Sequence, residues 1–361
     1  MIEADLPLVF TREHAVRAGY TDKAVDWRLS SGAWRTLRRA VFCPASAYET
    51  ASPEQRHVLA GCGVLLAMDA DEVISHLTAA LAYGWPAPLD VDAVPWTTLA
   101  AQTRGVTRRR NERIRQVAPL PDHHVNTRLG VPLTSPPRTV ADCLRHLPAE
   151  ASVPIADYAV GHGVDLEAVA RILRWQESWP YAARGRASIE LVDPRRESWL
   201  ESRSAVAWQR LGVPAPTSQV DLFDERGRHV ARVDFLWADL GVVGEADGWA
   251  KYPLAAEPSG QWDALRAEKV REDRLRDLGY EVVRWTTADV MRPDALLGPR
   301  LARTLARARP HLVRGTRRTS PVPEPHVVPA AGLSALARLS PTGQVLARTR
   351  SYSLEPGDLA S

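Results

Sequence analysis

The feature that most constrains this chain is a pair of neighbouring apolar segments carrying acidic residues, at 229–237 and 240–246. Asp234 lies in the first segment and Glu245 in the second, with Asp247 directly after it. Side chains two residues apart on a strand share a face, so Glu245 and Asp247 are expected to point the same way. The tight connection between the segments favours antiparallel neighbours, which would bring Asp234 beside them.

Three carboxylates on one face of a sheet repel one another unless a cation lies among them. Oxygen ligands alone favour a hard ion, so the sequence predicts Mg²⁺ or Mn²⁺ held by Asp234, Glu245 and Asp247. Lys251 follows closely and is expected to hold the attacking water or to neutralise the transition state. Glu201, on a preceding helix, would add a fourth carboxylate. The alternative is that these are solvated strand ends, since Asp-Gly is also a common turn signal.

The second half of the chain alternates helices and strands in a definite order. The expected elements are a helix at 197–211, strands at 218–223, 229–237 and 240–246, a helix at 263–278, a strand at 280–285 and a helix at 293–307. These elements form a predicted α/β domain at 196–309. A segment with Pro180, Gly185 and Pro194 predicts a linker at 176–195. Residues 310–361 are rich in Pro, Ser, Arg and Ala without a period, which predicts a disordered tail.

The first 50 residues have the pattern of a small helix-turn-helix with a wing. Thr11 is placed to cap a helix ending at Arg17, and Thr21 to cap a second helix through Ser31. A short hairpin follows, which completes the shape of a winged helix that binds DNA. The residues expected to contact DNA are Lys23, Arg28, Arg35, Arg38 and Arg39.

Residues 51–175 form a predicted mixed α/β middle domain. Its expected elements are helices at 53–68, 75–83, 138–147, 151–160 and 166–173, and a strand at 96–101. A dense cluster of arginines between Arg104 and Arg115 is open to two interpretations. It is either an exposed loop face or a patch that contacts phosphates.

The overall composition narrows the class of protein without proving a function. The formal net charge is only +3, and nearly all the positive charge is Arg, a bias that a G+C-rich genome would also produce. Three widely spaced cysteines with no CxxC pair argue against a disulfide framework or a zinc site, and favour a reducing cytoplasm. Residues 1–10 lack a basic segment typical of a signal peptide, and the most apolar run, 58–68, is too short to span a bilayer. No membrane association is therefore expected.

The acidic segments and their surroundings resemble a known superfamily. The matching residues are Leu200-Glu-Ser-Arg203, Arg232-Val-Asp234, Gly244-Glu-Ala-Asp-Gly248, Lys251, Arg271-Glu-Asp273 and Gly279 to Trp285. Together they resemble the restriction-endonuclease-like PD-(D/E)XK superfamily, in the branch similar to very-short-patch-repair endonucleases. The resemblance implies a Mg²⁺-dependent site at Asp234 and Glu245. The common motif has Lys two places after the Glu, where this chain has Asp247.

The front half resembles a second family. The matching residues are Phe10-Thr-Arg12, Arg28 to Arg35, Ser75-His-Leu-Thr-Ala-Ala80 and Gly130 to Asp142. They are similar to AbiEi-type antitoxins, whose winged helix is implicated in repressing the promoter of their own operon. This resemblance implies DNA as a partner and a cognate toxin as a second one.

The sequence therefore predicts an α+β protein with a winged helix, a mixed middle domain and a restriction-endonuclease-like domain. Two functions remain open. The first is a DNA-binding protein with a Mg²⁺-dependent endonuclease domain that hydrolyses phosphodiester bonds. The second is an antitoxin-like transcriptional regulator, of the type IV toxin–antitoxin kind, whose nuclease-like domain is catalytically silent.

Overall fold

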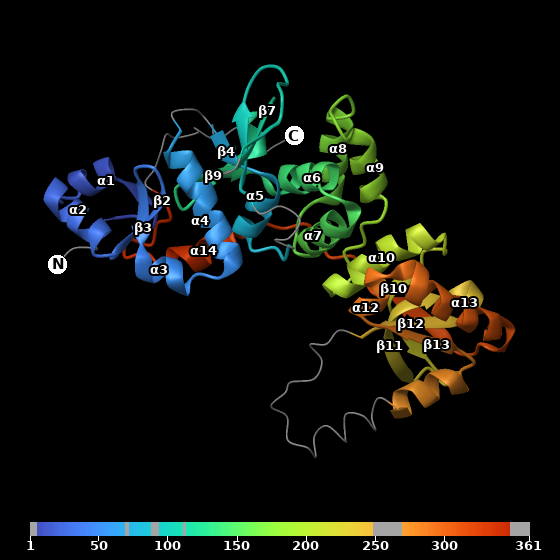
Figure 1. Cartoon of the computed structure of the whole chain (residues 1–361). Coiled ribbons are helices and arrows are strands. Elements are labelled where there is room, and N and C mark those ends of the chain that lie inside the picture. The colour runs from blue at the N-terminus through green and yellow to red at the C-terminus, as the bar shows by residue number, and fades with distance from the viewer. Residues whose placement is uncertain (1–5, 69–71, 88–93, 111–112, 248–268, 347–361) are drawn as a thin grey trace, which may run out of the picture. The chain divides into compact units, whose positions relative to one another are not determined.

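The computed structural model describes residues 6–68, 72–87, 94–110, 113–247 and 269–346 (Figure 1). It divides into two compact units, each of which is built from more than one stretch of chain. Unit 1 comprises residues 1–155, 162–187 and 325–361, and unit 2 comprises residues 156–161 and 188–324. Both units contain helices and mixed sheets, so the predicted α+β class is confirmed.

The front of unit 1 is a helix pair followed by a hairpin, in the order that the sequence predicts. Its elements are β1 (Phe10–Thr11), α1 (Arg12–Arg17), α2 (Asp22–Ser30), β2 (Trp34–Arg38) and β3 (Val41–Pro44). Both predicted caps are confirmed: the Thr11 hydroxyl accepts from the backbone N–H of His14, and that of Thr21 accepts from Ala24. The three strands pair in the order β1-β3-β2. Phe10, Trp34 and Phe42 pack at the centre of this module.

The remainder of unit 1 surrounds a six-stranded mixed sheet in the order β6-β7-β5-β4-β9-β8. The strands are β4 (Glu72–Ile74), β5 (Trp96–Ala100), β6 (Arg108–Arg110), β7 (Arg113–Ala118), β8 (Val125–Arg128) and β9 (Val131–Thr134). The helices are α3 (Ala45–Thr50), α4 (Pro53–Leu66), α5 (His76–Tyr83), η1 (Asp122–His124), α6 (Pro136–His146), α8 (Leu166–Trp175) and α9 (Ala182–Ile189). A further helix, α7 (Ala149–Gly161), begins in unit 1 and ends in unit 2.

Unit 2 is a five-stranded sheet in the order β13-β12-β11-β10-β14, with β12 and β13 parallel and the other pairs antiparallel. Its strands are β10 (Thr217–Phe223), β11 (His229–Trp237), β12 (Val242–Ala246), β13 (Glu281–Trp285) and β14 (Thr316–Thr319). Its helices are α10 (Trp199–Leu211), η2 (Ala238–Leu240), α12 (Thr287–Met291), η4 (Pro293–Leu297), α13 (Gly298–Arg307) and η5 (Pro310–Leu312), and residues 269–277 are also helical. The rest of the helix expected at 263–278 lies outside the described residues.

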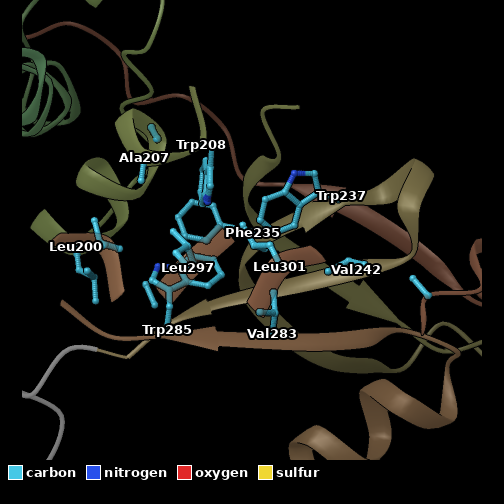
Figure 2. Packing of buried hydrophobic residues seen from close by; sticks show 14 residues of the cluster. Leu200, Ala207, Trp208, Phe235, Trp237, Val242, Val283, Trp285, Leu297 and Leu301 are labelled. Atoms are coloured by element: carbon cyan, nitrogen blue, oxygen red, sulfur yellow. The ribbon is translucent and has the colours of Figure 1, made fainter. Parts of the chain in front are cut away.

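Both faces of this sheet are covered by helices. On one face, α10, α12 and α13 bury a cluster of aromatic rings in which Trp208, Phe235 and Trp285 pack against one another (Figure 2). On the other face, Leu275 and Leu278 at the end of helix 269–277 pack against Val243 and Val233. The central strands of the sheet are therefore buried on both sides, so a charged side chain that is buried there needs a partner.

Two predictions about the organisation of the chain are wrong. The tail expected to be disordered from residue 310 contains β14, which pairs with the outer edge of β10, and α14 (Ala331–Ala337). Leu333, Leu336, Val345 and Leu346 are buried, so this segment contributes apolar surface to a core and is ordered for that reason. The expected linker at 176–195 contains α9, and Ala182 and Ser188 of that helix are buried. Residues 347–361 of the predicted tail lie outside the described residues.

Within the described ranges, every helix is too short or too polar to cross a membrane.

Candidate functional site

The two acidic residues shared by the predicted motif lie side by side on the sheet of unit 2. β11 and β12 are antiparallel, with Phe235 opposite Gly244, so the adjacent residues Asp234 and Glu245 are neighbours across the strand pair. The backbone N–H of Ala246 donates to Asp234 Oδ2 at 2.8 Å, which holds the Asp234 carboxylate against β12. The predicted juxtaposition of these two carboxylates is thus confirmed.

Glu245 lies in an unusual environment for a carboxylate, because it is only 2% exposed. Its Oε2 forms an ion pair with Arg271 Nη2 at 3.2 Å, from helix 269–277. Its Oε1 is buried and accepts no hydrogen bond within the described part of the chain. Burial first, and then the charge of Asp234, raises the pKa of Glu245 to about 7. Among the described residues, one oxygen of this carboxylate is therefore desolvated without a compensating partner.

Glu201 approaches the same pair of carboxylates from the first turn of α10. Ser198 caps that helix, and its hydroxyl donates to Glu201 Oε1 at 2.7 Å. Glu201 Oε2 accepts from the backbone of Glu197 at 3.0 Å and from Gln219 Nε2 at 2.9 Å. Burial and the charge of Asp234 raise the pKa of Glu201. Glu201 is therefore electrostatically coupled to Asp234, while its oxygens already accept hydrogen bonds from the protein.

Gln219 connects these groups and was not identified from the sequence. It lies within β10 with a φ of 53°, a left-handed conformation that costs a non-glycine residue energy. Its amide donates to Glu201, and its Oε1 accepts from Arg232 Nε at 2.8 Å. Arg232 also pairs with Glu197 at 2.6 Å. The strained backbone thus places the Gln219 amide between Glu201 of α10 and Arg232 of β11. No pattern in the sequence predicts this role.

Asp247 does not complete the predicted cluster of three carboxylates. Its side chain is 42% exposed, and its Oδ2 lies 3.9 Å from Arg284 Nη1 on β13. Arg284 also pairs with Glu272 of helix 269–277 at 3.2 Å. Among the described residues, no group of three or more His, Cys, Asp or Glu side chains is arranged to hold a metal ion. The convergence of three carboxylates was therefore predicted incorrectly, because the parallel strand β13 supplies an arginine beside Asp247.

An arginine from helix 269–277 supplies positive charge at this site. Lys251, the predicted basic residue, lies outside the described residues. Among the described residues, Arg271 contacts Glu245, and its Nη1 donates to the backbone oxygen of Arg232 at 3.3 Å. Arg271 belongs to the motif Arg271-Glu-Asp273, which is part of the superfamily resemblance. The motif alone does not predict a contact with Glu245.

Asp234 and Glu245 could together provide oxygen ligands for a divalent cation. Asp234 and Glu245 are adjacent, both would supply oxygen, and Glu245 Oε1 is a buried acceptor that has no donor in the described part of the chain. A hard cation is the ligand that such a pair of carboxylates prefers. The oxygen ligands of Asp234 and Glu245 therefore fit Mg²⁺ or Mn²⁺. In this structure, the guanidinium of Arg271 forms an ion pair with Glu245.

The residues expected to contact DNA lie in the front module of unit 1. Lys23 is exposed on α2, and Arg35 and Arg39 are exposed on and beside β2. Arg28 is half-buried, with its guanidinium over the rings of Tyr20 and Trp34 at 5.1 and 5.4 Å. Arg28 therefore packs against the module's aromatic residues, whereas Lys23 and Arg39 extend into solvent.

The two units define an α+β protein with mixed sheets and a pair of buried or half-buried carboxylates. No family model matches the chain. Two curated proteins of Mycobacterium tuberculosis are similar to part of it: uncharacterized protein MT2308 of strain CDC 1551 / Oshkosh and uncharacterized protein Rv2248 of strain ATCC 25618 / H37Rv. Each is 32% identical over 124 residues, which are 34% of this chain and 43% of the relative. The match thus spans less than half the length of these relatives.

One solved structure gives a weak match to the fold. The crystal structure of the RV2827C protein from Mycobacterium tuberculosis aligns with a TM-score of 0.34 and 15% identity, over 56% of this chain and 76% of that one. A likeness at this level identifies neither the fold nor the function.

Proposed function

We propose that this chain is a DNA-binding protein whose unit 2 is a divalent-metal-dependent nuclease-type domain, acting on phosphodiester bonds. The observation that supports it most directly is the buried Glu245 carboxylate beside Asp234, with Glu245 Oε1 lacking a donor among the described residues. Keeping two carboxylates close together in a buried place is unfavourable unless a cation joins them. The order of elements around them, helix, three strands, helix and strand, agrees with the resemblance to restriction-endonuclease-like domains.

Each residue of the site has a proposed part in that activity. Asp234 and Glu245 would hold Mg²⁺ or Mn²⁺, which supplies the Lewis acid that polarises a phosphodiester group. Arg271, whose guanidinium reaches Glu245, would stabilise negative charge on the phosphate once it is released from that carboxylate. Gln219 would hold the carboxylate of Glu201, whose charge acts on Asp234.

A second candidate function is favoured by specific contacts. Arg271 already neutralises Glu245, and Asp247 is close to Arg284, so the site tolerates its own charges without a metal. That arrangement suits an antitoxin-like transcriptional regulator in which unit 2 is catalytically silent. In both cases the front module would bind DNA as a winged helix, which the helix-turn-helix and hairpin of residues 10–44 support.

Metal binding and cleavage distinguish the two functions. We expect Mg²⁺ or Mn²⁺ to raise the melting temperature of the purified protein. When the metal concentration is a hundredfold above Kd, the free energy of unfolding should increase by about 2.7 kcal/mol. Asp234→Asn and Glu245→Gln should each remove most of this shift. Asp239→Asn, which changes an exposed acid in the same unit, should leave it intact. Lys251→Ala should keep the metal-dependent shift and abolish cleavage.

Cleavage is measured on supercoiled, linear and single-stranded DNA with Mg²⁺, Mn²⁺ or EDTA. Cleavage that requires the metal and is lost in Glu245→Gln would support the nuclease. A metal-dependent shift without cleavage of any nucleic acid would support the silent regulator. If the wild-type protein shows no shift with either metal, the carboxylates are not a metal site.

A further inference from the structure

A buried group of charged side chains in unit 1 has no part in the proposed function. Asp142 on α6 is at its centre, and its side chain is fully buried. Its Oδ2 accepts from Arg138 Nε at 2.7 Å, and its Oδ1 accepts from Arg145 Nη2 at 3.0 Å and from Gln176 Nε2 at 3.1 Å. Both arginine side chains are also fully buried. We name Arg138, Asp142, Arg145 and Gln176 the buried arginine cluster.

The buried arginine cluster contains one positive charge more than its carboxylate neutralises. Burial raises the pKa of Asp142, but the charges of Arg138 and Arg145 lower it well below its ordinary value, so Asp142 is ionised. The adjacent imidazoles of His124 and His146 stay neutral, because burial lowers their pKa to about 4 and about 3. Among the described residues, Asp142 is the single carboxylate that bonds to either guanidinium. A buried charge is costly unless it is paired, so the cluster favours an added anion.

Three polar atoms of the cluster are buried without a hydrogen-bond partner in the described part of the chain. They are Arg138 Nη2, Arg145 Nε and Gln176 Oε1. A buried N–H group without an acceptor costs free energy that a bound oxyanion would recover. The two arginines are seven residues apart on α6, which places them on one face of that helix. Their unpaired N–H groups therefore belong to neighbouring side chains that one anion can contact together.

Aromatic rings at the end of α8 and just after it cover both guanidinium groups. The centroid of Trp179 lies 5.2 Å from the guanidinium carbon of Arg138 and 5.1 Å from that of Arg145. Trp175 lies 5.7 Å from Arg138, and 44% of its surface is exposed. Trp179 is half-buried in the turn between α8 and α9. A guanidinium bonds more strongly to an oxyanion than to a ring, so a phosphate can take the place of the Trp179 ring.

Two residues beside the cluster have strained backbones, which is typical of functional sites. His76 on α5 has a φ of 51° and Tyr181 has a φ of 63°, conformations that cost a non-glycine residue energy. Both side chains contact His146, which follows Arg145 directly. His76 Nε2 lies 2.9 Å from His146 Nδ1, and the rings of Tyr181 and His146 lie 5.7 Å apart. The tertiary structure thus holds strained residues from two separate segments against the cluster.

We propose that the buried arginine cluster is a binding site for a phosphate group, which Arg138 and Arg145 hold once the Trp179 ring moves aside. Phosphate supplies the missing acceptors and the missing negative charge, and guanidinium groups match its geometry. The exposed ring of Trp175 beside the cluster offers a surface on which a base can stack, so a nucleotide should bind more tightly than inorganic phosphate. The site shares no residue with the carboxylate pair of unit 2 or with the predicted DNA contacts, so it is independent of both.

Isothermal titration calorimetry of the full-length protein measures the affinity for inorganic phosphate, adenosine monophosphate and adenosine. The buffer contains EDTA, which removes divalent metals, and about 150 mM KCl, which screens exposed charges. We expect phosphate and the nucleotide to bind, the nucleotide on the order of tenfold more tightly, and adenosine not to bind. Absence of binding by both phosphate and the nucleotide overturns the proposal. Binding of adenosine as tight as that of the nucleotide also overturns it.

Arg145→Lys tests the guanidinium directly. Lysine keeps the positive charge but lacks the planar set of donors, so phosphate affinity should fall on the order of tenfold. Arg113→Lys is the matched control, because it makes the same change at another buried ion pair of unit 1, with Glu72 at 2.9 Å. It should leave phosphate binding unchanged, and near-UV circular dichroism checks that both variants fold. Wild-type affinity in Arg145→Lys, or an equal loss in Arg113→Lys, contradicts the proposal.

Two tryptophan variants test the covering ring and the stacking surface without changing any charge. Trp179→Ala removes the ring that competes with phosphate, so phosphate affinity should rise about threefold, whereas unchanged or weaker binding overturns the proposal. Trp175→Ala should reduce the affinity for the nucleotide to that for inorganic phosphate, and a persistent advantage of the nucleotide would contradict stacking on Trp175. Lys23→Ala should leave phosphate binding intact, and loss of binding there would place the phosphate on the front module instead.

Discussion

Gly244 is a residue on which the packing around the carboxylate pair depends. It precedes Glu245 on β12 and lies opposite Phe235 on β11. A Cβ at this position would lie 2.6 Å from Trp285 and 2.9 Å from Trp237, two buried rings of the core shown in Figure 2. The absence of a side chain therefore lets both indoles approach the strand that presents Glu245.

We expect Gly244→Ala to destabilise unit 2 by about 1–3 kcal/mol, because the added Cβ would force two buried indoles to shift. Urea unfolding followed by tryptophan fluorescence measures this change. Gly298→Ala is the matched control, because its Cβ would meet only the flexible end of Leu211 at 3.0 Å and a carbonyl oxygen at 3.3 Å. We expect that change to stay within about 1 kcal/mol. Equal stability of Gly244→Ala and the wild type would show that the rings repack freely.

Helices α4, α5 and α6 bury ionisable groups that make the stability of unit 1 depend on pH. His57 Nε2 is hydrogen-bonded to the Thr78 hydroxyl at 2.9 Å, and His76 Nε2 to His146 Nδ1 at 2.9 Å. Burial lowers the pKa of His57 to about 4 and that of His146 to about 3. The folded unit therefore keeps these imidazoles neutral at pH values where the unfolded chain binds protons.

The direction of the pH effect follows from that difference in proton binding. Stability is complete above pH 6.5, the ordinary pKa of histidine, and it is lost as the pH falls toward 4 because the unfolded state takes up more protons. Each such histidine adds about 1.4 kcal/mol per pH unit to this loss. We expect His57→Gln to reduce the slope of unfolding free energy against pH, between pH 6 and 4.5, by about that amount. His311→Gln, an exposed histidine, should leave the slope unchanged; an unaltered slope in both variants would contradict the argument.

At the scale of the whole molecule, the chain leaves unit 1 after residue 187 and returns to it at residue 325. The returning segment is tied to the beginning of the chain, since Leu8 and Val9 donate to the backbone oxygens of Gln344 and Val345 at 3.0 and 2.9 Å. Gly332 at the start of α14 lies so close to α5 that a Cβ would be 2.1 Å from the Leu81 oxygen. Residues 325–346 are therefore part of the structure that supports the front module.

We expect Gly332→Val to separate α14 from α5 and to loosen unit 1 without affecting unit 2. Hydrogen–deuterium exchange measured by mass spectrometry should show faster exchange in peptides that contain Leu8, Val9 and 331–346, with unchanged exchange in β11 and β12. Ser334→Val changes an exposed position on the same helix and should leave all of these rates unchanged. Unchanged exchange in Gly332→Val would mean that α14 does not stabilise the front module.

The sequence alone determined the features that depend on near neighbours along the chain. Thr11 and Thr21 cap helices because their hydroxyls reach backbone groups three residues ahead, and β11 begins and ends at the predicted residues. Asp234 and Glu245 could be placed together because a short connection between two strands leaves few alternatives to antiparallel pairing. Each of these inferences rests on hydrogen bonds or alternation within a short segment.

Only the tertiary structure decided which charges meet across elements that are far apart in the sequence. Arg271 reaches Glu245, Arg284 lies beside Asp247, and Glu72 holds Arg113, in each case because sheet order and helix packing bring them together. The same reason explains the tail: its composition indicates disorder, but Leu333, Leu336, Val345 and Leu346 are buried, and α14 lies against α5. An ion pair or a burial of this kind depends on the position of a partner that local sequence patterns do not specify.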